Sequence, residues 1–380
     1  LNYEPLAEGY GRSEGYERYD GRTAPSDQSY WAMEFNAGSV QIFTGNTVTG
    51  GLSGATGVML VEPYDVTGTW AGSNAAGTLV LGSVTGTFQL SEPLLVAAVP
   101  AAGADSLAVE NGAPTIDLDR TWLSAAQEAQ RALIGKPTGS GTIRGVATHN
   151  DTTYTWRDNA GATECLGYKA TTAGWVALTQ SRRLAFTSGG VTEIIEGNTV
   201  TGATSAATGL VIRTVLTSGS WAGGDAAGWL HITGQTGTFQ AENLNVGASL
   251  NLATIAANST LNSFPAGGKY RCISHNFYGA SNQFRLYGTN DVGYAFEMVN
   301  HVMVPIITGM TTDTPTRIFE IANHLGLCFP GGSVQMSAIG EPLDWDVLLG
   351  ATEIGFGTEI TDVIQANESA VAIFGKQKIA

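Results

Sequence analysis

Apolar residues in this chain occur mostly in short runs that glycines interrupt every few positions. Val58-Met59-Leu60-Val61 and Leu79-Val80-Leu81 are typical runs, and threonine and valine are frequent around them. These runs lack a sustained period of 3.6 residues, so they predict short antiparallel strands joined by tight turns. The pattern therefore indicates an all-β protein.

One stretch of this kind occurs twice. Gly45-Asn46-Thr47-Val48-Thr49-Gly50 returns as Gly197-Asn198-Thr199-Val200-Thr201-Gly202. The matches that follow in the same order are Ser53 with Ser205, Ala55-Thr56-Gly57 with Ala207-Thr208-Gly209, Trp70-Ala71-Gly72 with Trp221-Ala222-Gly223, Ala75-Ala76-Gly77 with Ala226-Ala227-Gly228, and Gly86-Thr87-Phe88-Gln89 with Gly237-Thr238-Phe239-Gln240. Such a match indicates a duplicated folding unit, which we expect to be a small β-barrel or sandwich. The copies are not adjacent, as a solenoid requires, so they are interpreted as two insertions.

Between and after the copies, strands and turns alternate regularly. Strands are expected at Ile143–His149, 152–157, 164–169 and 175–186, and four such strands in meander order are typical of a propeller blade or half a sandwich. Strands resume at 270–274, 284–287, 293–298, 302–308, 317–322, 325–329 and 333–339. The last apolar strand, 370–374, has no expected partner. About three blades result, too few to close a ring, so we expect the polypeptide to continue past Ala380.

One helix is predicted after the first copy. Asp119 or Thr121 can cap it, and Gly135 with Pro137 ends it. Its apolar face repeats at three and four residues and consists of Trp122, Ala125, Ala126, Ala129 and Leu133.

We therefore expect an all-β fold: a partial or open, β-propeller-like meander platform with two inserted small β-barrel or sandwich modules and one amphipathic helix. The expected divisions are 1–40 for a Tyr-rich arm and first strand, 41–98 for the first module, 99–140 for a linker with the helix, 141–188 for the first blade, 189–257 for the second module, and 258–380 for further blades.

Composition narrows the function classes. A formal net charge of -15 with 13% charged residues describes an acidic chain, which argues against sequence-specific nucleic-acid binding.

Cys165, Cys272 and Cys328 are widely spaced, so buried free thiols are expected rather than disulfides or a zinc site. The longest apolar run, 94–102, is too short to cross a membrane, and no signal peptide is recognised.

The sequence predicts no catalytic, metal or cofactor-binding residues. Gly11-Arg12-Ser13-Glu14-Gly15 matches the spacing of a nucleophile elbow but lacks the flanking strand and helix. The histidines are scattered singly at His149, His231, His275, His301 and His324. Two carboxylate groups, Asp117 with Asp119 and Glu341 with Asp344 and Asp346, have a spacing that allows a calcium loop or a glycosidase pair. We expect both groups to serve as helix caps and turns instead.

The first twenty-two residues are rich in tyrosine, glycine and charge and have no strand or helix period. Tyrosine and arginine are favoured in partly desolvated contacts, so an arm that docks on a neighbouring subunit is one interpretation. A frayed terminus is the other. The candidate subunit-contact residues are Tyr10, Arg12, Tyr16, Arg18 and Tyr19.

Five further motifs occur along the chain: Gly9-Tyr10-x-Arg12-x-x-Gly15-Tyr16-Glu17-Arg18-Tyr19-Asp20-Gly21, Asp119-x-x-Trp122-Leu123 to Arg131 with Pro137-x-Gly139-Ser140-Gly141, Tyr168-Lys169-Ala170-x-x-x-Gly174-Trp175, Phe329-Pro330-Gly331-Gly332-Ser333-Val334-Gln335-x-Ser337-x-Ile339-Gly340-x-Pro342, and Gly350-Ala351-x-Glu353-Ile354-x-x-Gly357. Together these motifs resemble virion proteins of tailed phages, and specifically the tail tube or nozzle proteins of short-tailed phages, the tail tubular protein B group.

The resemblance implies a structural protein of the virion tail. It would be a non-enzymatic subunit of a six-fold homo-oligomeric ring below the portal and adaptor, and DNA would pass through the ring without specific binding. The acidic composition agrees, because a conduit should not grip phosphates.

Two alternatives remain open. A carbohydrate- or receptor-binding protein would use exposed aromatics such as Trp31, Trp70, Trp221 or Trp229. A polysaccharide-degrading enzyme would use Asp344 with Asp346, or Asp117 with Asp119, as its acids.

Overall fold

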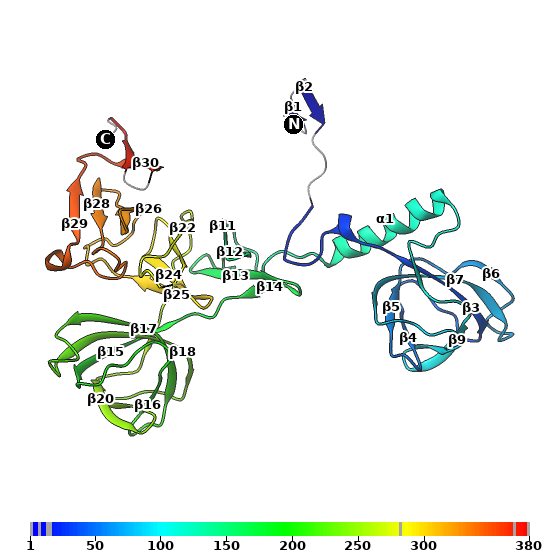
Figure 1. Cartoon of the computed structure of the whole chain (residues 1–380), viewed down its shortest axis with the longest axis horizontal. Coiled ribbons are helices and arrows are strands. Elements are labelled where there is room, and N and C mark those ends of the chain that lie inside the picture. Colours follow the sequence, from blue (N-terminus) through cyan, green and yellow to red (C-terminus); the bar gives the residue numbers. More distant parts are fainter. Residues whose placement is uncertain (1–2, 7–8, 13–16, 281–282, 368–369, 378–380) are drawn as a thin grey trace. The chain divides into compact units, whose positions relative to one another are not determined.

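The computed structural model describes residues 3–6, 9–12, 17–280, 283–367 and 370–377. Strands account for 48% and helices for 7% of the chain, which confirms the all-β expectation (Figure 1). The chain divides into two compact units: unit 1 is Leu1–Lys136 with Thr171–Gly174, and unit 2 is Pro137–Ala170 with Trp175–Ala380. A short hairpin of β1 (Tyr3–Leu6) and β2 (Gly9–Arg12) precedes the first large sheet.

Each copy of the repeat forms a closed barrel of six strands, so the two predicted modules are confirmed as small barrels. Barrel 1 contains β3 (Trp31–Gly38), β4 (Thr47–Gly50), β5 (Thr56–Met59), β7 (Ala75–Thr85), β8 (Pro93–Val96) and β9 (Val99–Ala104), with β6 (Tyr64–Thr67) and β10 (Val109–Glu110) at its edges. Barrel 2 contains β15 (Arg182–Gly189), β16 (Thr199–Gly202), β17 (Thr208–Ser218), β18 (Ala226–Thr236), β19 (Glu242–Val246) and β20 (Ser249–Ile255), with β21 (Thr260–Leu261) beside β15. The strand order is the same in both.

Both barrels extend beyond the limits expected from the repeat, which were 41–98 and 189–257. The closing strand of each barrel precedes its repeat: β3 pairs with β7, and β15 pairs with β18. In barrel 1, β9 also lies past residue 98. Closure leaves no open sheet edge, so these strands are part of the folding unit. The repeat does not reveal the closing strands because β3 and β15 share little sequence.

A buried glutamate ties two loops together in each barrel. The Glu242 carboxylate accepts hydrogen bonds from the backbone N–H groups of Thr204 (2.7 Å), Ser205 (2.8 Å) and Gln240 (3.1 Å) and from Ser205 Oγ (2.5 Å). Glu92 repeats this pattern with the N–H groups of Leu52, Ser53 and Gln89 and with Ser53 Oγ, at 2.6–3.0 Å. Burial opposes ionisation of Glu242, but these donors outweigh it and lower its pKa to about 2.

The same tie explains a glycine of the duplicated motif. A Cβ on Gly50 would overlap the Glu92 carboxylate and Ser53 Oγ, and one on Gly202 would overlap Glu242 and Ser205 Oγ. Glycine is therefore required at this position so that the backbone can approach the carboxylate closely.

Three four-stranded antiparallel sheets in meander order form what we call the platform. They consist of β11 (Ile143–His149), β12 (Thr152–Asp158), β13 (Cys165–Thr171) and β14 (Gly174–Ala177); β22 (Arg271–His275), β23 (Arg285–Thr289), β24 (Ala295–Val299) and β25 (Val302–Ile306); and β26 (Arg317–Ile321), β27 (His324–Cys328), β28 (Ser333–Met336) and β29 (Thr352–Gly355). A two-stranded sheet of β30 (Ile360–Asn367) and β31 (Ala370–Gly375) follows. The first strands contact one another in succession, from β11 to β22, β26 and β30. Successive sheets also share apolar cores, as the blades of a propeller do.

Two strand expectations were wrong. The segment 175–186 divides into β14, which completes the first sheet, and β15, which belongs to barrel 2. The chain leaves the sheet between them, where Gln180 forms an isolated bridge with Met303 of β25. The last strand, β31, does have a partner, because it pairs with β30.

The α-helix, α1 (Ile116–Leu133), follows barrel 1 and a 3-10 turn, η1 (Pro25–Asp27), lies near it. Thr115 caps α1 by accepting from Leu118 N–H, so the expectation of Asp119 or Thr121 as the cap was wrong. The buried face also differs from the expected one. Trp122, Ala126 and Gln130 are buried, whereas Ala129 and Leu133 are exposed. Gln130 is held inward because its side chain donates to Thr23 O at 2.8 Å.

The three cysteines are free thiols, as expected. Cys165 and Cys328 are buried and Cys272 is half-buried, and burial raises the pKa of Cys165 and Cys328 to about 12. No helix among the described residues is long and apolar enough to cross a membrane.

The glutamate tie predicts the effect of Glu242→Gln. The NH₂ group of the new glutamine would face backbone N–H groups, which are also donors. We therefore expect the free energy of unfolding of barrel 2 to fall by about 1.5–3 kcal/mol at pH 7. Urea unfolding of the full chain, followed by tryptophan fluorescence, measures the loss. Because the folded pKa of Glu242 is lowered from 4.5, its stabilisation is complete above pH 4.5 and decreases as the pH falls toward about 2. Glu193→Gln changes an exposed glutamate of the same barrel and is the control; equal unfolding midpoints for the two variants would contradict the tie.

Candidate functional site

The predicted subunit-contact residues lie at the start of unit 1. Tyr16 lies outside the described residues, and for Tyr10 and Arg12 only the backbone, in β2, is described. Arg18 and Tyr19 are exposed, and Tyr19 leaves 56% of its surface accessible. Their role in a subunit contact stays a prediction.

The residues just after the candidate arm are firmly anchored. Buried Asp20 accepts from Gly135 N–H (3.0 Å) and pairs with Arg22, whose guanidinium also donates to Leu133 O (3.1 Å) and to Ala173 O. The sequence analysis did not predict this anchor, because it joins residues that are more than one hundred positions apart in the chain. The exposed Arg18 and Tyr19 are therefore presented from a fixed base.

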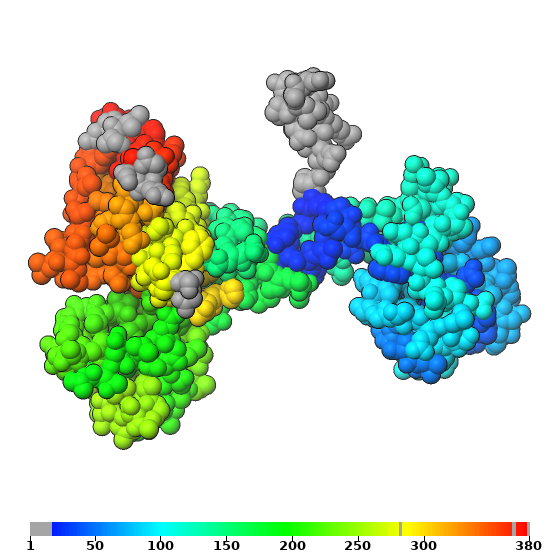
Figure 2. Space-filling view, in the orientation of Figure 1, coloured from blue at the N-terminus to red at the C-terminus, as the bar shows by residue number. Residues whose placement is uncertain are grey.

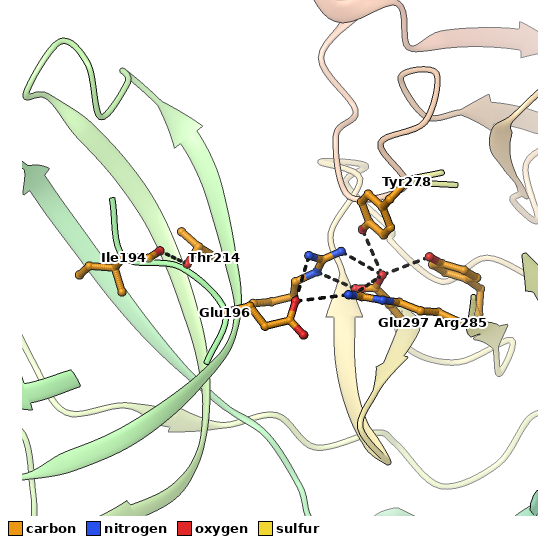
Figure 3. Close-up of polar contacts among 8 residues, drawn as sticks. Ile194, Glu196, Thr214, Tyr278, Arg285 and Glu297 are labelled. Carbon is orange, nitrogen blue, oxygen red and sulfur yellow. Dashed lines mark hydrogen bonds and ion pairs between the residues drawn. The ribbon is translucent and has the colours of Figure 1, made fainter. Parts of the chain in front are cut away.

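A buried network of ion pairs lies where barrel 2 meets the platform. Glu297 of β24 is completely buried and forms ion pairs with Arg213 of β17 and Arg285 of β23 (Figure 3). Its oxygens accept from Arg213 Nε (2.9 Å), from a terminal nitrogen of Arg213 (3.1 Å) and from Arg285 (3.0 Å). The hydroxyls of Tyr278 and Tyr287 donate to the same carboxylate at 3.0 and 3.1 Å.

Glu196, from the loop before β16, completes this group, which we call the Glu297 cluster. Its carboxylate lies 3.5 Å from Arg213 and 3.3 Å from Arg285 (Figure 3). Burial disfavours the charge of Arg213, but attraction to Glu297 outweighs it and keeps the pKa of Arg213 above its usual value. Burial also raises the pKa of Tyr278 and Tyr287, with the charge of Glu297 adding to the rise.

The chemistry of the Glu297 cluster suits a joint rather than a reaction. Four of its five hydrogen bonds reach Oε1 of Glu297 and one, from Arg213 Nε, reaches Oε2. The carboxylate is also completely buried and paired with two arginines, so a substrate does not reach it. Beside the cluster, Ile212 of barrel 2 packs against Val299, Val302 and Val304, and Figure 2 shows barrel 2 in green against the yellow and orange platform sheets.

The corresponding flank of barrel 1 is covered differently. The pairs Ala32↔Val80 and Arg183↔His231 have the same place in the strand registers of the two barrels. In barrel 1 this flank is apolar and packs on α1, with Tyr30 and Trp122 in edge-to-face contact at 5.6 Å. In barrel 2 the same flank carries Arg183 and His231, and His231 pairs across the strands with Arg213, which binds Glu297 of the platform. Each barrel is therefore attached to its neighbouring element through the same flank.

Three of the histidines are held by hydrogen bonds to residues of other strands or loops. His231 contacts Asn262 (3.2 Å), His275 contacts Asn323 (3.1 Å), and His324 contacts Ser337 O (2.7 Å). Burial lowers the pKa of His231 to about 3, and the charges of Arg183 and Arg213 add to this. These three side chains are therefore structural.

The structure brings His149 and His301 together, which their positions in the sequence did not indicate. Both line a cavity of about 690 Å³. His149 contacts Ser274 Oγ at 2.9 Å and His301 contacts Tyr154 Oη at 2.7 Å. Burial lowers the pKa of both. Across the described ranges, no group of three or more His, Cys, Asp or Glu side chains could hold a metal ion.

Asp344 and Asp346 lie in a turn as expected, whereas the pair of Asp117 and Asp119 does not cap α1, a role that Thr115 takes. Asp117 and Asp119 lie in the first turn of α1, where Asp119 accepts from Tyr30 Oη at 2.6 Å. Asp346 caps a 3-10 turn, η2 (Val347–Leu349), by accepting from Leu348 N–H at 2.9 Å, and Asp344 accepts from Asp346 N–H at 2.9 Å.

Most of the tryptophans considered for sugar stacking belong to barrel cores. Trp221 is 7% exposed and stacks on Phe186 at 5.2 Å, so the expectation that it is exposed was wrong. Trp70 stacks on Phe35 at the same distance, and Trp31 packs against the same core. Trp229 is half-buried beneath the guanidinium of Arg183, 4.3 Å from its ring.

Comparison with known proteins yielded no match, either to a protein-family model or to a curated protein.

The Glu297 cluster predicts that Arg213→Met loosens the attachment of barrel 2. Removing one partner of a buried ion pair costs about 3–5 kcal/mol, because the remaining charge is left unpaired. Limited proteolysis of the full chain should therefore cut the connections around barrel 2 faster in the variant. The control is Arg131→Met, which removes an exposed pair with Glu128 that is worth about 1 kcal/mol or less. Equal cleavage rates for both variants would refute a joint at the cluster.

Proposed function

We propose that this chain is a structural virion protein, a subunit of a ring in the tail tube or nozzle of a short-tailed phage. The ring would form part of the conduit for DNA ejection, with the portal, the adaptor and other tail proteins as neighbours. The observation that carries the proposal is the platform, whose four-stranded sheets pack one after another through their first strands. The motifs that resemble tail nozzle proteins lie in this platform, in α1 and in the amino-terminal arm.

The way the parts are joined supports a mechanical role. A tail ring must keep its shape while DNA passes, so its domains need fixed connections. The Glu297 cluster provides one, because separating barrel 2 from the platform would leave a fully buried carboxylate without its ion pair to Arg213. Asp20 and Arg22 similarly fix the base of the arm.

The charge of the chain also supports a conduit. With 18 Lys and Arg against 33 Asp and Glu, the protein repels the phosphate backbone rather than binding it. A ring of identical subunits uses heterologous contacts that close by rotation. The exposed Arg18 and Tyr19, together with Tyr10, Arg12 and Tyr16, are our candidates for one side of that contact.

The proposal predicts where the protein lies in a phage particle. Cryo-electron microscopy of purified virions should place the chain on the tail axis as a ring of six copies. A position on a peripheral fibre or spike, or the absence of the chain from purified particles, would contradict the proposed function.

The arm prediction can be tested separately. The double change Arg18→Ala and Tyr19→Ala should lower incorporation into particles several-fold, because arginine and tyrosine are frequent hot-spot residues. Quantitative mass spectrometry of purified particles measures incorporation. Arg120→Ala, at an exposed position of α1, is the control and should leave incorporation unchanged. Incorporation of the double variant at the control level would remove these two residues from the contact.

A further inference from the structure

A cavity of about 420 Å³ lies next to the Glu297 cluster. Residues of β17 and β18 form one of its walls. Its walls come from barrel 2, from the segment after β25 and from the loop before η2. This volume lies in the range of about 300–1,000 Å³ that is usual for small-molecule sites. All of the lining residues belong to unit 2.

Two indole rings line the cavity from opposite parts of the chain. Trp229 lies on β18 of barrel 2, and Trp345 lies in the loop before η2. Arg183 covers one face of the Trp229 ring. Indole combines a large apolar face with a polar edge, so it suits ligands that have both kinds of surface.

Carboxylates with unused acceptor positions lie beside these rings. Among the described residues, the Glu341 carboxylate has no hydrogen-bond or ion-pair partner, although it lines the cavity. Asp344 and Asp346 each use one oxygen for a backbone N–H and leave the other oxygen without a partner in the described chain. Burial raises the pKa of Glu341, and Asp344 adds to the rise while Arg213 partly offsets it. The cavity is thus rich in acceptors that need donors.

These features select one class of ligand. An anion such as phosphate or a uronic acid would meet three carboxylates. The cavity does not form a metal site, since the described residues contain no suitable group of ligands. A small organic cation would stack on a ring face within about 6 Å of its centroid, but the guanidinium of Arg183 already occupies one face of Trp229. A neutral sugar supplies many hydroxyl donors and an apolar ring face.

The duplicated barrel offers an internal comparison. The place of Trp229, which pairs with Ala185, corresponds to Thr78 in barrel 1, which pairs with Glu34. A tryptophan at this position is therefore not required by the barrel fold. Trp229 is therefore a feature of barrel 2 alone, and it lines the wall of the cavity.

We propose that this cavity binds a neutral carbohydrate, with Trp229 and Trp345 contacting the sugar ring and Glu341 and Asp344 accepting from its hydroxyls. The proposal does not rest on the tail function, because it concerns a site within one copy of the chain. A ring in the virion could be found without sugar binding, and sugar binding could be found without a ring.

The test uses the full chain and a panel of neutral oligosaccharides that contains hexoses, deoxyhexoses and N-acetylhexosamines. We expect binding of at least one panel member by saturation-transfer NMR, followed by titration calorimetry with that oligosaccharide. Glu341→Gln should weaken the measured affinity about tenfold, because one hydrogen bond to a charged group is lost. Trp345→Phe should also weaken it, while the melting temperature of each variant reports on folding.

The matched control is Glu110→Gln, an exposed carboxylate of β10 in unit 1, which should bind as the unmodified chain does. Failure of the unmodified chain to bind any panel member at millimolar concentration would overturn the proposal. Unchanged affinity in a folded Glu341→Gln variant together with a folded Trp345→Phe variant would also overturn it, since the sugar would then bind elsewhere.

Discussion

Burying a carboxylate is costly unless donors surround its oxygens, and this chain meets that condition at three glutamates. Glu92 and Glu242 each hold two loops of a barrel against one another, and Glu297 holds barrel 2 against the platform. In each case the glutamate accepts bonds from segments distant in the sequence. The shape of the barrels and the position of barrel 2 thus depend on the same kind of interaction, which requires ionised glutamate and well-placed donors.

The two barrels show how one fold acquires two attachments. Their cores have the same strand order and the same stacked pair of phenylalanine and tryptophan, which in barrel 2 is Phe186 with Trp221. Their shared flank differs in chemistry. Apolar side chains on barrel 1 receive a helix, whereas Arg213 on barrel 2 enters an ion-pair cluster and His231 lies nearby. Core residues and attachment residues have therefore diverged separately.

The sequence predicted the strand content, both barrels and the meander sheets, because glycine spacing and repeats are local signals. It placed a first strand before residue 41 and a strand at 175–186, but it did not assign β3 or β15 to the barrels, because these strands differ between the copies and only their long-range pairing joins them to a barrel. The Glu297 cluster was also missed, since Arg213, Arg285 and Glu297 carry no local motif. Glu92 and Glu242 could have been found from the repeat, because Glu92 lies three residues after Gln89 and Glu242 lies two residues after Gln240, where the Gly-Thr-Phe-Gln motif ends in each copy.

The first and last strands of each barrel are neighbours, since β3 pairs with β9 and β15 pairs with β20. The chain consequently enters and leaves a barrel at nearly the same place, as is common for domains that tolerate insertion. A gene segment encoding such a barrel could be spliced into the connection between two sheets without altering either sheet. The barrel is thus suited to insertion as a whole domain, and its two occurrences in one chain agree with such insertion.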